Sequence, residues 1–373
     1  MPAPRDFEDE QTITFRPPAG WAPSARPEKP VHILLLLDEN GPAKRIPLRT
    51  LPVIIGRTAP AEVVLAGGTV SRRHCQLELR QEQIVLTDLE STNGTLVDDV
   101  KIESATVLQD GATINIGGHR LRYHRRGMEE SAEADAMDRE LDEASSYVAS
   151  ILPAPILSGA VRADWFYQPS TRLAGDAFGY QMLDQRHFAV FLLDVAGHGT
   201  GAALHAVSVA NVLRQCLLPD ADMHDPAAVL ASLNRMFPME QYNGLFFTIW
   251  YGVYDTVSRV MSFAAGGHHA GYMMPPPRRQ PVALPAPNPA IGMIPDMPMT
   301  AARIEVPAGS AICLFSDGVF EIVDRSGRQW GLDDVLPLLP GSSAARQLYD
   351  QVRLAARPGP LDDDFSVLLL RFP

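Results

Sequence analysis

One acidic, alanine-rich stretch near the middle of the chain, residues 125–152, constrains the fold more than any other feature. Its apolar residues follow the four-three spacing of a heptad helix, at Met137, Leu141, Ala144, Val148 and Ile151. Pro153 and Pro155 come next and cannot continue a helix. We therefore expect two separate domains joined by a helix over residues 126–152, since 373 residues are enough for two domains.

The heptad pattern of this helix extends over only about two repeats, which is short for a coiled coil. Two interpretations stay open. In the first, residues 129–152 pair with a second copy of the chain and form a homodimer. In the second, the helix is a linker that packs on the domain that follows it.

Charge and composition exclude several classes of function. The formal net charge is -12 and the isoelectric point is about 5.3, whereas nucleic acids and anionic membrane surfaces both require a basic face. The N-terminus has no apolar segment of the kind that a signal peptide contains, and no apolar run is long enough to span a bilayer. The three cysteines are far apart. We expect a cytoplasmic protein with reduced thiols.

The part of the chain before the helix reads as all-β. Residues 1–29 are polar and proline-rich, and we expect them to be flexible. Within residues 30–125, short apolar runs alternate with Gly, Asn and Asp turns, as in a β-sandwich. The runs are His32–Leu37, Pro52–Ile55, Cys75–Leu79, Ile84–Leu86, Thr113–Ile116 and Leu121–Tyr123.

Residues 153–373 mix strand-like and helix-like segments, so we expect an α+β domain, an αββα sandwich. The expected strands are His187–Leu193, Phe246–Tyr254, Val260–Ala264, Ala311–Phe315 and Phe365–Phe372. The expected helices are Gly201–Leu218, Pro226–Phe237, with Asp225 as its cap, and Ser342–Ala356. The proline-dense residues 275–298 are expected to form a surface connection.

Three aspartates lie at the ends of apolar strand-like runs. Asp194 ends FAVFLLD, Asp317 follows ICLFS, and Asp363 precedes FSVLLL. Several carboxylates at the edge of a buried sheet do not stay ionised unless a positive charge joins them. Because no His/Cys set accompanies them, an oxygen-binding cation such as Mg²⁺ or Mn²⁺ is expected rather than Zn²⁺.

The motifs LAGDAFG, DVAGHG, AAGGHHAGY, SDGVFE and DDDFS resemble, in order and spacing, those of the metal-dependent protein phosphatases (the protein phosphatase 2C-like family) and their bacterial SpoIIE-type branch. The resemblance implies hydrolysis of phosphoserine or phosphothreonine by water that two Mn²⁺ or Mg²⁺ ions activate, without a covalent phosphoenzyme. It also implies that Asp194 bridges the two ions and that His198 is the candidate general acid. The further metal ligands it implies are Asp176, the Val195 carbonyl, Asp317 and Asp363.

One position departs from the phosphatase pattern. The family usually has a second aspartate three residues after the position of Asp176, and here that residue is Gly179. We expect weaker metal binding rather than loss of catalysis. The alternative is a binding scaffold whose phosphatase domain has little or no activity. Arg172, just before the Asp176 motif, is expected to be solvated, and His268 and His269 to shape a turn.

Loop motifs in the β domain resemble those of forkhead-associated (FHA) domains, namely Gly56-Arg57, Ser71-x-x-His74 and Thr92-Asn93-Gly94. The resemblance implies a phosphothreonine site, with His74 as a structural residue and the ligand contacts made by Arg57, Ser71, Arg72, Thr92 and Asn93. A phosphate with nearly two negative charges suits such a set of donors. The partners it implies are a serine/threonine kinase, the substrates of that kinase, or a phosphorylated anti-sigma-factor antagonist.

Overall fold

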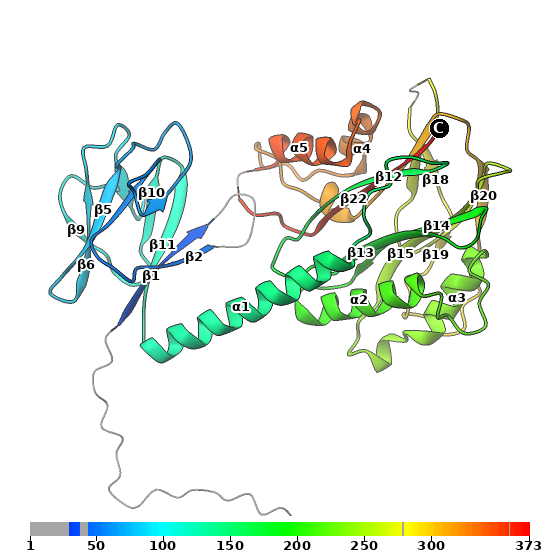
Figure 1. Ribbon diagram of the computed structural model, residues 1–373, viewed down its shortest axis with the longest axis horizontal. Helices are drawn as coiled ribbons and strands as arrows, with labels where there is room; N and C mark the ends of the chain where they lie inside the picture. The colour runs from blue at the N-terminus through cyan, green and yellow to red at the C-terminus, as the bar shows by residue number, and fades with distance from the viewer. Residues whose placement is uncertain (1–29, 38–43, 278–279, 358) are drawn as a thin grey trace, which may run out of the picture.

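The structure, a computed structural model, describes residues 30–37, 44–277, 280–357 and 359–373. A β-sandwich is followed by a long helix and by a larger domain in which helices flank two sheets (Figure 1). The fold class predicted from the sequence is thus confirmed for both domains. The segment 1–29, predicted to be flexible, lies outside the described residues. No helix in the described part of the chain is both long enough and apolar enough to cross a membrane.

The N-terminal sandwich consists of a six-stranded and a five-stranded sheet. The first has the order β2-β1-β11-β10-β7-β8 and contains β1 (Val31–Leu37), β2 (Lys44–Pro47), β7 (Thr95–Val97), β8 (Val100–Lys101), β10 (Thr113–Ile116) and β11 (His119–Arg126). The second has the order β4-β3-β5-β6-β9 and contains β3 (Val53–Gly56), β4 (Val63–Val64), β5 (Cys75–Arg80), β6 (Gln83–Asp88) and β9 (Thr106–Val107). Along β5, buried Cys75 and Leu77 alternate with the more exposed Gln76 and Glu78, as expected for a strand with one face in the core.

The C-terminal domain also has two sheets. One has the order β12-β22-β21-β17-β18 and contains β12 (Arg162–Gln168), β17 (Gly271–Met274), β18 (Val282–Leu284), β21 (Ser310–Phe315) and β22 (Phe365–Phe372). The other has the order β13-β14-β15-β16-β19, with β20 also paired to β16. It contains β13 (Asp176–Met182), β14 (His187–Val195), β15 (Phe247–Asp255), β16 (Val260–Gly266), β19 (Pro287–Asn288) and β20 (Ala302–Glu305).

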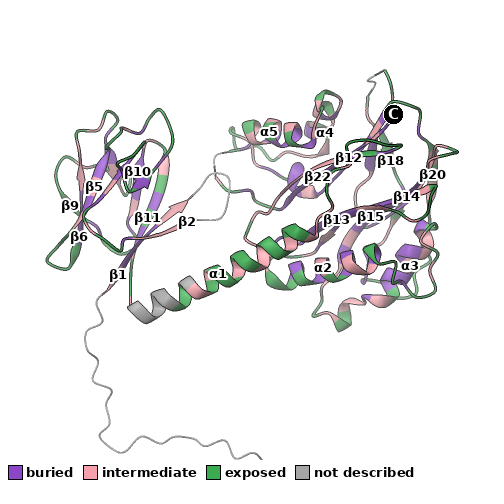
Figure 2. Cartoon of the chain, in the orientation of Figure 1, coloured by how far each residue is buried: buried purple, intermediate pink, exposed green. Residues whose placement is uncertain are grey.

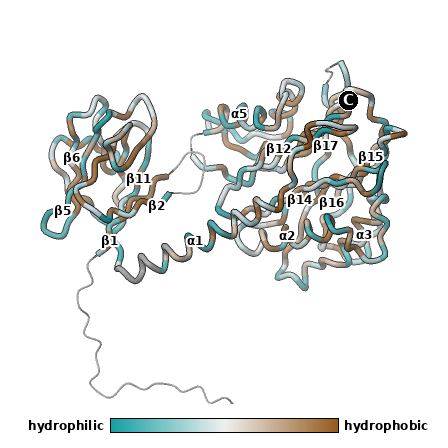
Figure 3. Tube along the Cα trace, viewed as in Figure 1, coloured by the Kyte–Doolittle hydropathy of each residue, from teal (hydrophilic) through white to brown (hydrophobic). Residues whose placement is uncertain are grey.

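Strand β14 lies between two cores, which explains why its sequence is apolar without alternation. Val190 and Leu192 face the second sheet, whereas Phe191 and Leu193 face the helical layer. All four are at most 4% exposed. Hydrophobic residues accordingly concentrate along the central strands of this domain (Figure 3). Such two-sided burial is what places an ionisable side chain at the end of β14 in a nonpolar setting.

Helices cover the outer faces of the two sheets. On one side are α2 (Thr200–Arg214) and α3 (Pro226–Met236), and Asp225 caps α3 by accepting a hydrogen bond from the Ala227 amide. On the other side are α4 (Leu332–Val335) and α5 (Ala345–Ala355). Three short 3₁₀ turns complete the domain, Met239–Gln241, Asp317–Val319 and Leu336–Gly341.

The connecting helix α1 (Met128–Ile151) is close to the predicted helix, and most of its described residues are exposed or half-buried (Figure 2). Two arginines of the C-terminal domain bind it. Arg172 donates to the Asp138 carbonyl and to the Asp142 carboxylate, at 2.9 and 2.6 Å, and Arg214 donates to the Ile151 carbonyl at 2.6 Å. These contacts support the linker interpretation. Pairing with a second copy stays a prediction.

The expected strands and helices of both domains are present with ends shifted by a few residues. The largest shift is in α2, which ends at Arg214 rather than Leu218, and Cys216 beyond it has a positive φ of 51°. The proline-dense segment is a connection, as expected, but it also contributes the edge strands β18 and β19. The sequence patterns gave no sign of β12 or β13, because half-buried polar residues interrupt them.

Candidate functional site

A cavity of about 500 Å³ opens where β14, β21 and β22 meet. Asp194 lies near the end of β14, Asp317 lies two residues after β21, and Asp363 lies two residues before β22. The cavity brings together five of the predicted site residues: Asp194, Val195, His198, Asp317 and Asp363. Ser170, Thr171 and Thr248 also line it and were not identified from the sequence. Thr248 lies opposite Asp194 in the β14–β15 register, which only the pairing reveals.

Asp176, the sixth predicted residue, lies next to this cluster, paired with Asp194 across the β13–β14 register. Its side chain is buried, with 1% of the residue exposed, and neither carboxylate oxygen has a hydrogen-bond partner among the described residues. Burial, and then the charges of Asp194 and Asp364, raise its pKa well above the ordinary range. A buried carboxylate without donors is costly, and a bound cation would offset that cost.

The other carboxylates of the cavity have raised pKa values as well. Burial, followed by the charges of Asp317 and Asp363, raises the pKa of Asp194 to about 7. Burial and the charge of Asp363 raise the pKa of Asp317 to about 6, and burial raises the pKa of Asp363. The donor set is almost entirely oxygen, which fits Mg²⁺ or Mn²⁺ better than a softer ion.

Asp364 does not line the cavity, but its carboxylate binds the loop of Ser170, which does. One of its oxygens accepts hydrogen bonds from the Ser170 amide and hydroxyl at 2.8 and 2.9 Å, and the other accepts from the Gly175 amide at 2.8 Å. Gly318 lets the loop after β21 approach this segment, since a Cβ there would lie 2.2 Å from the Asp364 carbonyl oxygen. The glycine of SDG is therefore required by backbone contact.

Replacing Asp364 with Ala should destabilise the C-terminal domain. The change leaves three donors of the Ser170–Gly175 loop without an acceptor, at a cost of about 2–4 kcal/mol. That loss exceeds the relief from removing one charge of the acidic cluster, so the melting temperature should fall by about 5–10 °C. Differential scanning calorimetry measures it. Asp362→Ala, at an exposed neighbour paired with Arg357, is the control and should shift melting little.

The glycine that departs from the phosphatase pattern does not face the carboxylates. Residues alternate along β13, so Gly179 points to the side opposite Asp176, where a Cβ would lie 2.6 Å from the Phe191 ring. A carboxylate at position 179 would enter the helix-covered core. The expectation that Gly179 weakens metal binding therefore loses its basis.

Two neighbouring expectations are not met by the structure. Arg172 is not a solvated side chain, because it binds Asp138 and Asp142 of α1 and is only 22% exposed. The two histidines of GGHH, expected to shape a turn, bond to the backbone instead: His268 Nδ1 lies 2.8 Å from the His269 carbonyl, and His269 Nε2 lies 2.6 Å from the Phe315 carbonyl at the end of β21, while no turn is assigned at these residues. Burial lowers the pKa of His268 to about 3, which keeps it neutral at pH 7.

The β-sandwich has a second cavity, of about 300 Å³, formed by three loops. It is lined by four of the predicted phosphothreonine contacts, Arg57, Ser71, Arg72 and Thr92. The Ser71 hydroxyl accepts a hydrogen bond from the Thr92 amide at 3.1 Å, which joins two of the loops. The pocket thus combines two arginines with three hydroxyl-bearing residues, since Thr69 lines it too, and this set is suited to a phosphate.

Two residues of the β-sandwich motifs act behind this pocket. His74 is fully buried, and its ring accepts a hydrogen bond from the Ser71 amide at 3.1 Å and contacts the Gly94 carbonyl at 3.1 Å, so its predicted structural role fits. Asn93 does not line the pocket. Its amide nitrogen donates to the Thr69 carbonyl at 2.7 Å, which fixes the pocket wall.

Comparison with known proteins identifies both domains. The profile of the family described as stage II sporulation protein E (SpoIIE) matches residues 184–373, and that of the FHA domain matches residues 53–117. Phosphoserine phosphatase RsbP of Bacillus subtilis is 26% identical over 187 residues, which are 49% of this chain and 45% of RsbP. FHA domain-containing protein FhaB of Mycolicibacterium smegmatis is 40% identical over 73 residues, which are 20% of this chain and 47% of FhaB.

Among solved structures, the SiaA-PP2C domain of Pseudomonas aeruginosa matches with a TM-score of 0.56 and 19% identity, covering 65% of this chain and 99% of that domain. This likeness shows the fold. The chain therefore joins an FHA domain to a domain of the PP2C fold. Since the SpoIIE profile spans about half of its length, the chain belongs to the stage II sporulation protein E family. It spans about half the length of the curated relatives described above.

Proposed function

We propose that this chain is a metal-dependent protein serine/threonine phosphatase whose FHA domain binds phosphothreonine on partner proteins. The observation that carries the proposal is the buried Asp176 carboxylate, which forms no hydrogen bond although the Ser316 and Ser366 hydroxyls lie near it, and which adjoins the cavity of Asp194, Asp317 and Asp363. We assign residues 30–125 to the FHA domain, 126–152 to the linker and 153–373 to the phosphatase domain.

The carboxylates Asp176, Asp194, Asp317 and Asp363 and the Val195 carbonyl would hold two Mn²⁺ or Mg²⁺ ions. No three of these acidic residues bring ligand atoms within 4.8 Å of one another, so ion binding would draw the carboxylates closer together. When bound, the two ions supply Lewis-acid activation of water and neutralise charge on the phosphoryl oxygens.

The residues of the cavity itself would position and protonate the substrate. His198 is exposed on the cavity wall and would donate a proton to the departing serine or threonine oxygen. Thr248 also lines this cavity, and its hydroxyl can donate a hydrogen bond to a phosphoryl group, whereas the hydroxyls of Ser170 and Thr171 already donate to Asp364 and to the Leu173 carbonyl. The proposed reaction uses water as the nucleophile and therefore forms no covalent intermediate with the chain.

The partners we propose are a serine/threonine kinase, its substrates, or a phosphorylated anti-sigma-factor antagonist. The name of the relative RsbP, a phosphoserine phosphatase, supports phosphoserine as the group on which the C-terminal domain acts. The scaffold alternative has no observation in its favour, because Gly179, which suggested it, faces the core.

The test is phosphate release by the full chain from phosphoserine and phosphothreonine peptides. We expect turnover with Mn²⁺ or Mg²⁺, its loss on chelation, and its recovery when either ion is restored. A well-folded chain that releases no phosphate at any concentration of either ion would eliminate the enzyme and leave the scaffold.

A further inference from the structure

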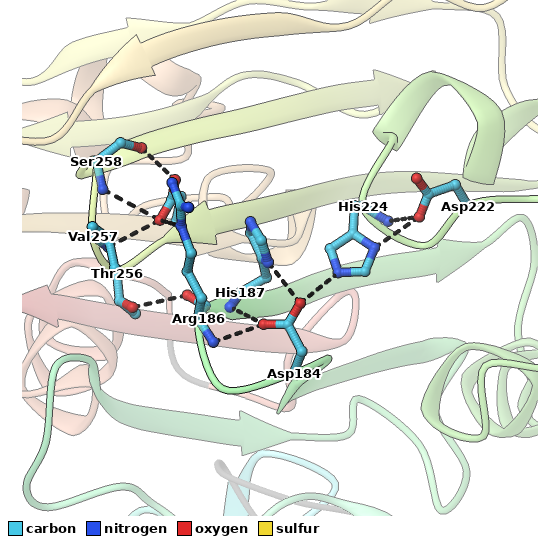
Figure 4. A network of polar contacts seen from close by, with 9 residues as sticks. Asp184, Arg186, His187, Asp222, His224, Thr256, Val257 and Ser258 are labelled. Carbon is cyan, nitrogen blue, oxygen red and sulfur yellow. Dashed lines mark hydrogen bonds and ion pairs between the residues drawn. The ribbon is translucent and has the colours of Figure 1, made fainter.

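A second group of metal-ligating side chains lies near the ends of β13 and β14 opposite to those that carry Asp176 and Asp194. It consists of Asp184 in the β13–β14 turn, His187 at the start of β14, and His224 in the connection between α2 and α3 (Figure 4). In the part of the chain that the structure describes, this is the one such group whose ligand atoms all lie within 4.8 Å of one another.

The three side chains converge on one oxygen atom. Asp184 Oδ2 lies 2.8 Å from His187 Nδ1 and 3.0 Å from His224 Nε2. The other oxygen, Oδ1, accepts hydrogen bonds from the backbone amides of Arg186 and His187, both at 2.7 Å. These two bonds fix the carboxylate, so that Oδ2 is held toward the rings of both histidines.

The contacts of the two His224 ring nitrogens indicate that this cluster contains a positive charge. Its Nδ1 lies 2.7 Å from Asp222 Oδ1 and its Nε2 lies 3.0 Å from Asp184 Oδ2, so both ring nitrogens face carboxylate oxygens. A neutral imidazole has only one N–H and can satisfy only one of these contacts. Either the ring carries a second proton or a cation lies between Nε2 and the Asp184 carboxylate.

We propose that Asp184, His187 and His224 bind a divalent transition-metal ion, Zn²⁺ foremost, at a site separate from the carboxylate cavity. Two imidazole nitrogens and one carboxylate oxygen form a donor set that zinc prefers, unlike the oxygen-rich set around Asp194. Tetrahedral zinc with bonds of about 2.0–2.1 Å separates its ligand atoms by about 3.3 Å. The Asp184 oxygen, at 2.8 and 3.0 Å from the two histidine nitrogens, would need to move away from them only slightly.

Asp222 fits the proposal as the residue that orients a ligand. Metal-bound histidines usually donate their second ring N–H to a carboxylate, which fixes the tautomer and the direction of the other nitrogen. The Asp222–His224 contact supplies this arrangement and leaves Nε2 directed at the site. The side chains of Asp184, His187 and His224 are 45%, 29% and 39% exposed, so water can take the fourth position.

A bound ion would tie together segments that are far apart in the sequence. The β13–β14 turn would be joined to the α2–α3 connection, which leads directly into the cap of α3 at Asp225. The ion would stabilise the packing of the helical layer on the sheet whose opposite strand ends carry Asp176 and Asp194. Its role would be structural, because none of the three ligands lines the carboxylate cavity.

The test titrates the full chain with Co²⁺ as a spectroscopic probe, in excess Mg²⁺ to occupy the carboxylate cavity. We expect one equivalent of Co²⁺ to give the strong visible bands of a four-coordinate ion, and Zn²⁺ to displace it. His187→Ala and His224→Ala should abolish the bands, whereas the control His119→Ala, in the FHA domain, should keep them. Asp222→Asn should weaken binding about 10- to 100-fold.

Thermal melting in excess Mg²⁺ gives a second readout. Zn²⁺ should raise the melting temperature of the unchanged chain and of His119→Ala, and should leave that of His187→Gln unchanged. Melting without zinc shows whether each variant is folded. Four-coordinate bands that persist in a folded His224→Ala chain would overturn the proposal. So would an unchanged chain that neither shows the bands nor responds to Zn²⁺, and a proton on His224 would then satisfy Asp184 and Asp222.

Discussion

Replacing Asp194 with Asn should reduce phosphopeptide hydrolysis on the order of 10³-fold or more, because the amide has no charge with which to join two cations. The loss should not come from unfolding. Burial and the charges of Asp317 and Asp363 raise the pKa of Asp194 to about 7, so this carboxylate is under electrostatic strain in the metal-free chain, and its neutral replacement removes that strain. Steady-state phosphate release at saturating Mn²⁺, beside a melting curve, measures both effects.

Asp362→Asn is the matched control for this experiment. Asp362 lines the same cavity, but its carboxylate is bound by Arg357 at 2.7 Å and is not one of the proposed ligands. Its rate should stay within a few-fold of the unchanged chain. An Asp194→Asn enzyme that retained a tenth of the original rate would contradict the assignment of Asp194 as the shared ligand.

The strands that carry the site could be predicted from the sequence because a buried strand consists mainly of apolar residues. Strand β14 is buried on both faces, so its apolar run could be read directly, and the aspartate that ends it could be recognised as misplaced in such a setting. The same reasoning located Asp317 and Asp363. The pairing of β21 with β22 brings Asp317 and Asp363 together, and the packing of the two sheets adds Asp194 from β14. Only the resemblance to a known family anticipated that all three line one cavity.

The features that the sequence did not predict depend on which face of a strand a residue occupies or on contacts between distant segments of the chain. Gly179 was interpreted from its spacing to Asp176, but an odd spacing along a strand reverses the face, and its neighbour is Phe191. Arg172 was expected in solvent because nothing in the sequence places α1 beside it. The Asp184–His187–His224 group joins a turn to a helix connection 40 residues apart, so no local motif marks it.

In the FHA pocket, too, the sequence motifs predicted the site but not the role of every residue in it. The motifs of three loops predicted a phosphate site, and four of the five predicted contacts line one cavity. The fifth, Asn93, turned out to hold the wall through Thr69. A motif thus predicts which loops meet. Which of its residues line the pocket and which support the loops depends on hydrogen bonds that form only in the fold.

Replacing Arg57 with Ala should weaken binding of a phosphothreonine peptide at least about 30-fold, a cost of about 2 kcal/mol, because charge-assisted bonds to phosphate are the strongest that this pocket offers. Isothermal titration of the full chain with the phosphorylated peptide measures the loss, and the unphosphorylated peptide should bind neither protein. Arg73→Ala is the matched control, since Arg73 is an exposed arginine of the neighbouring β4–β5 loop that does not line the cavity. Hydrolysis of a small aryl phosphate should be unchanged in both variants, because the FHA pocket and the carboxylate cavity belong to different domains. Equal weakening by the Arg57 and Arg73 substitutions would mean that general positive charge, and not the assigned pocket, attracts the phosphate.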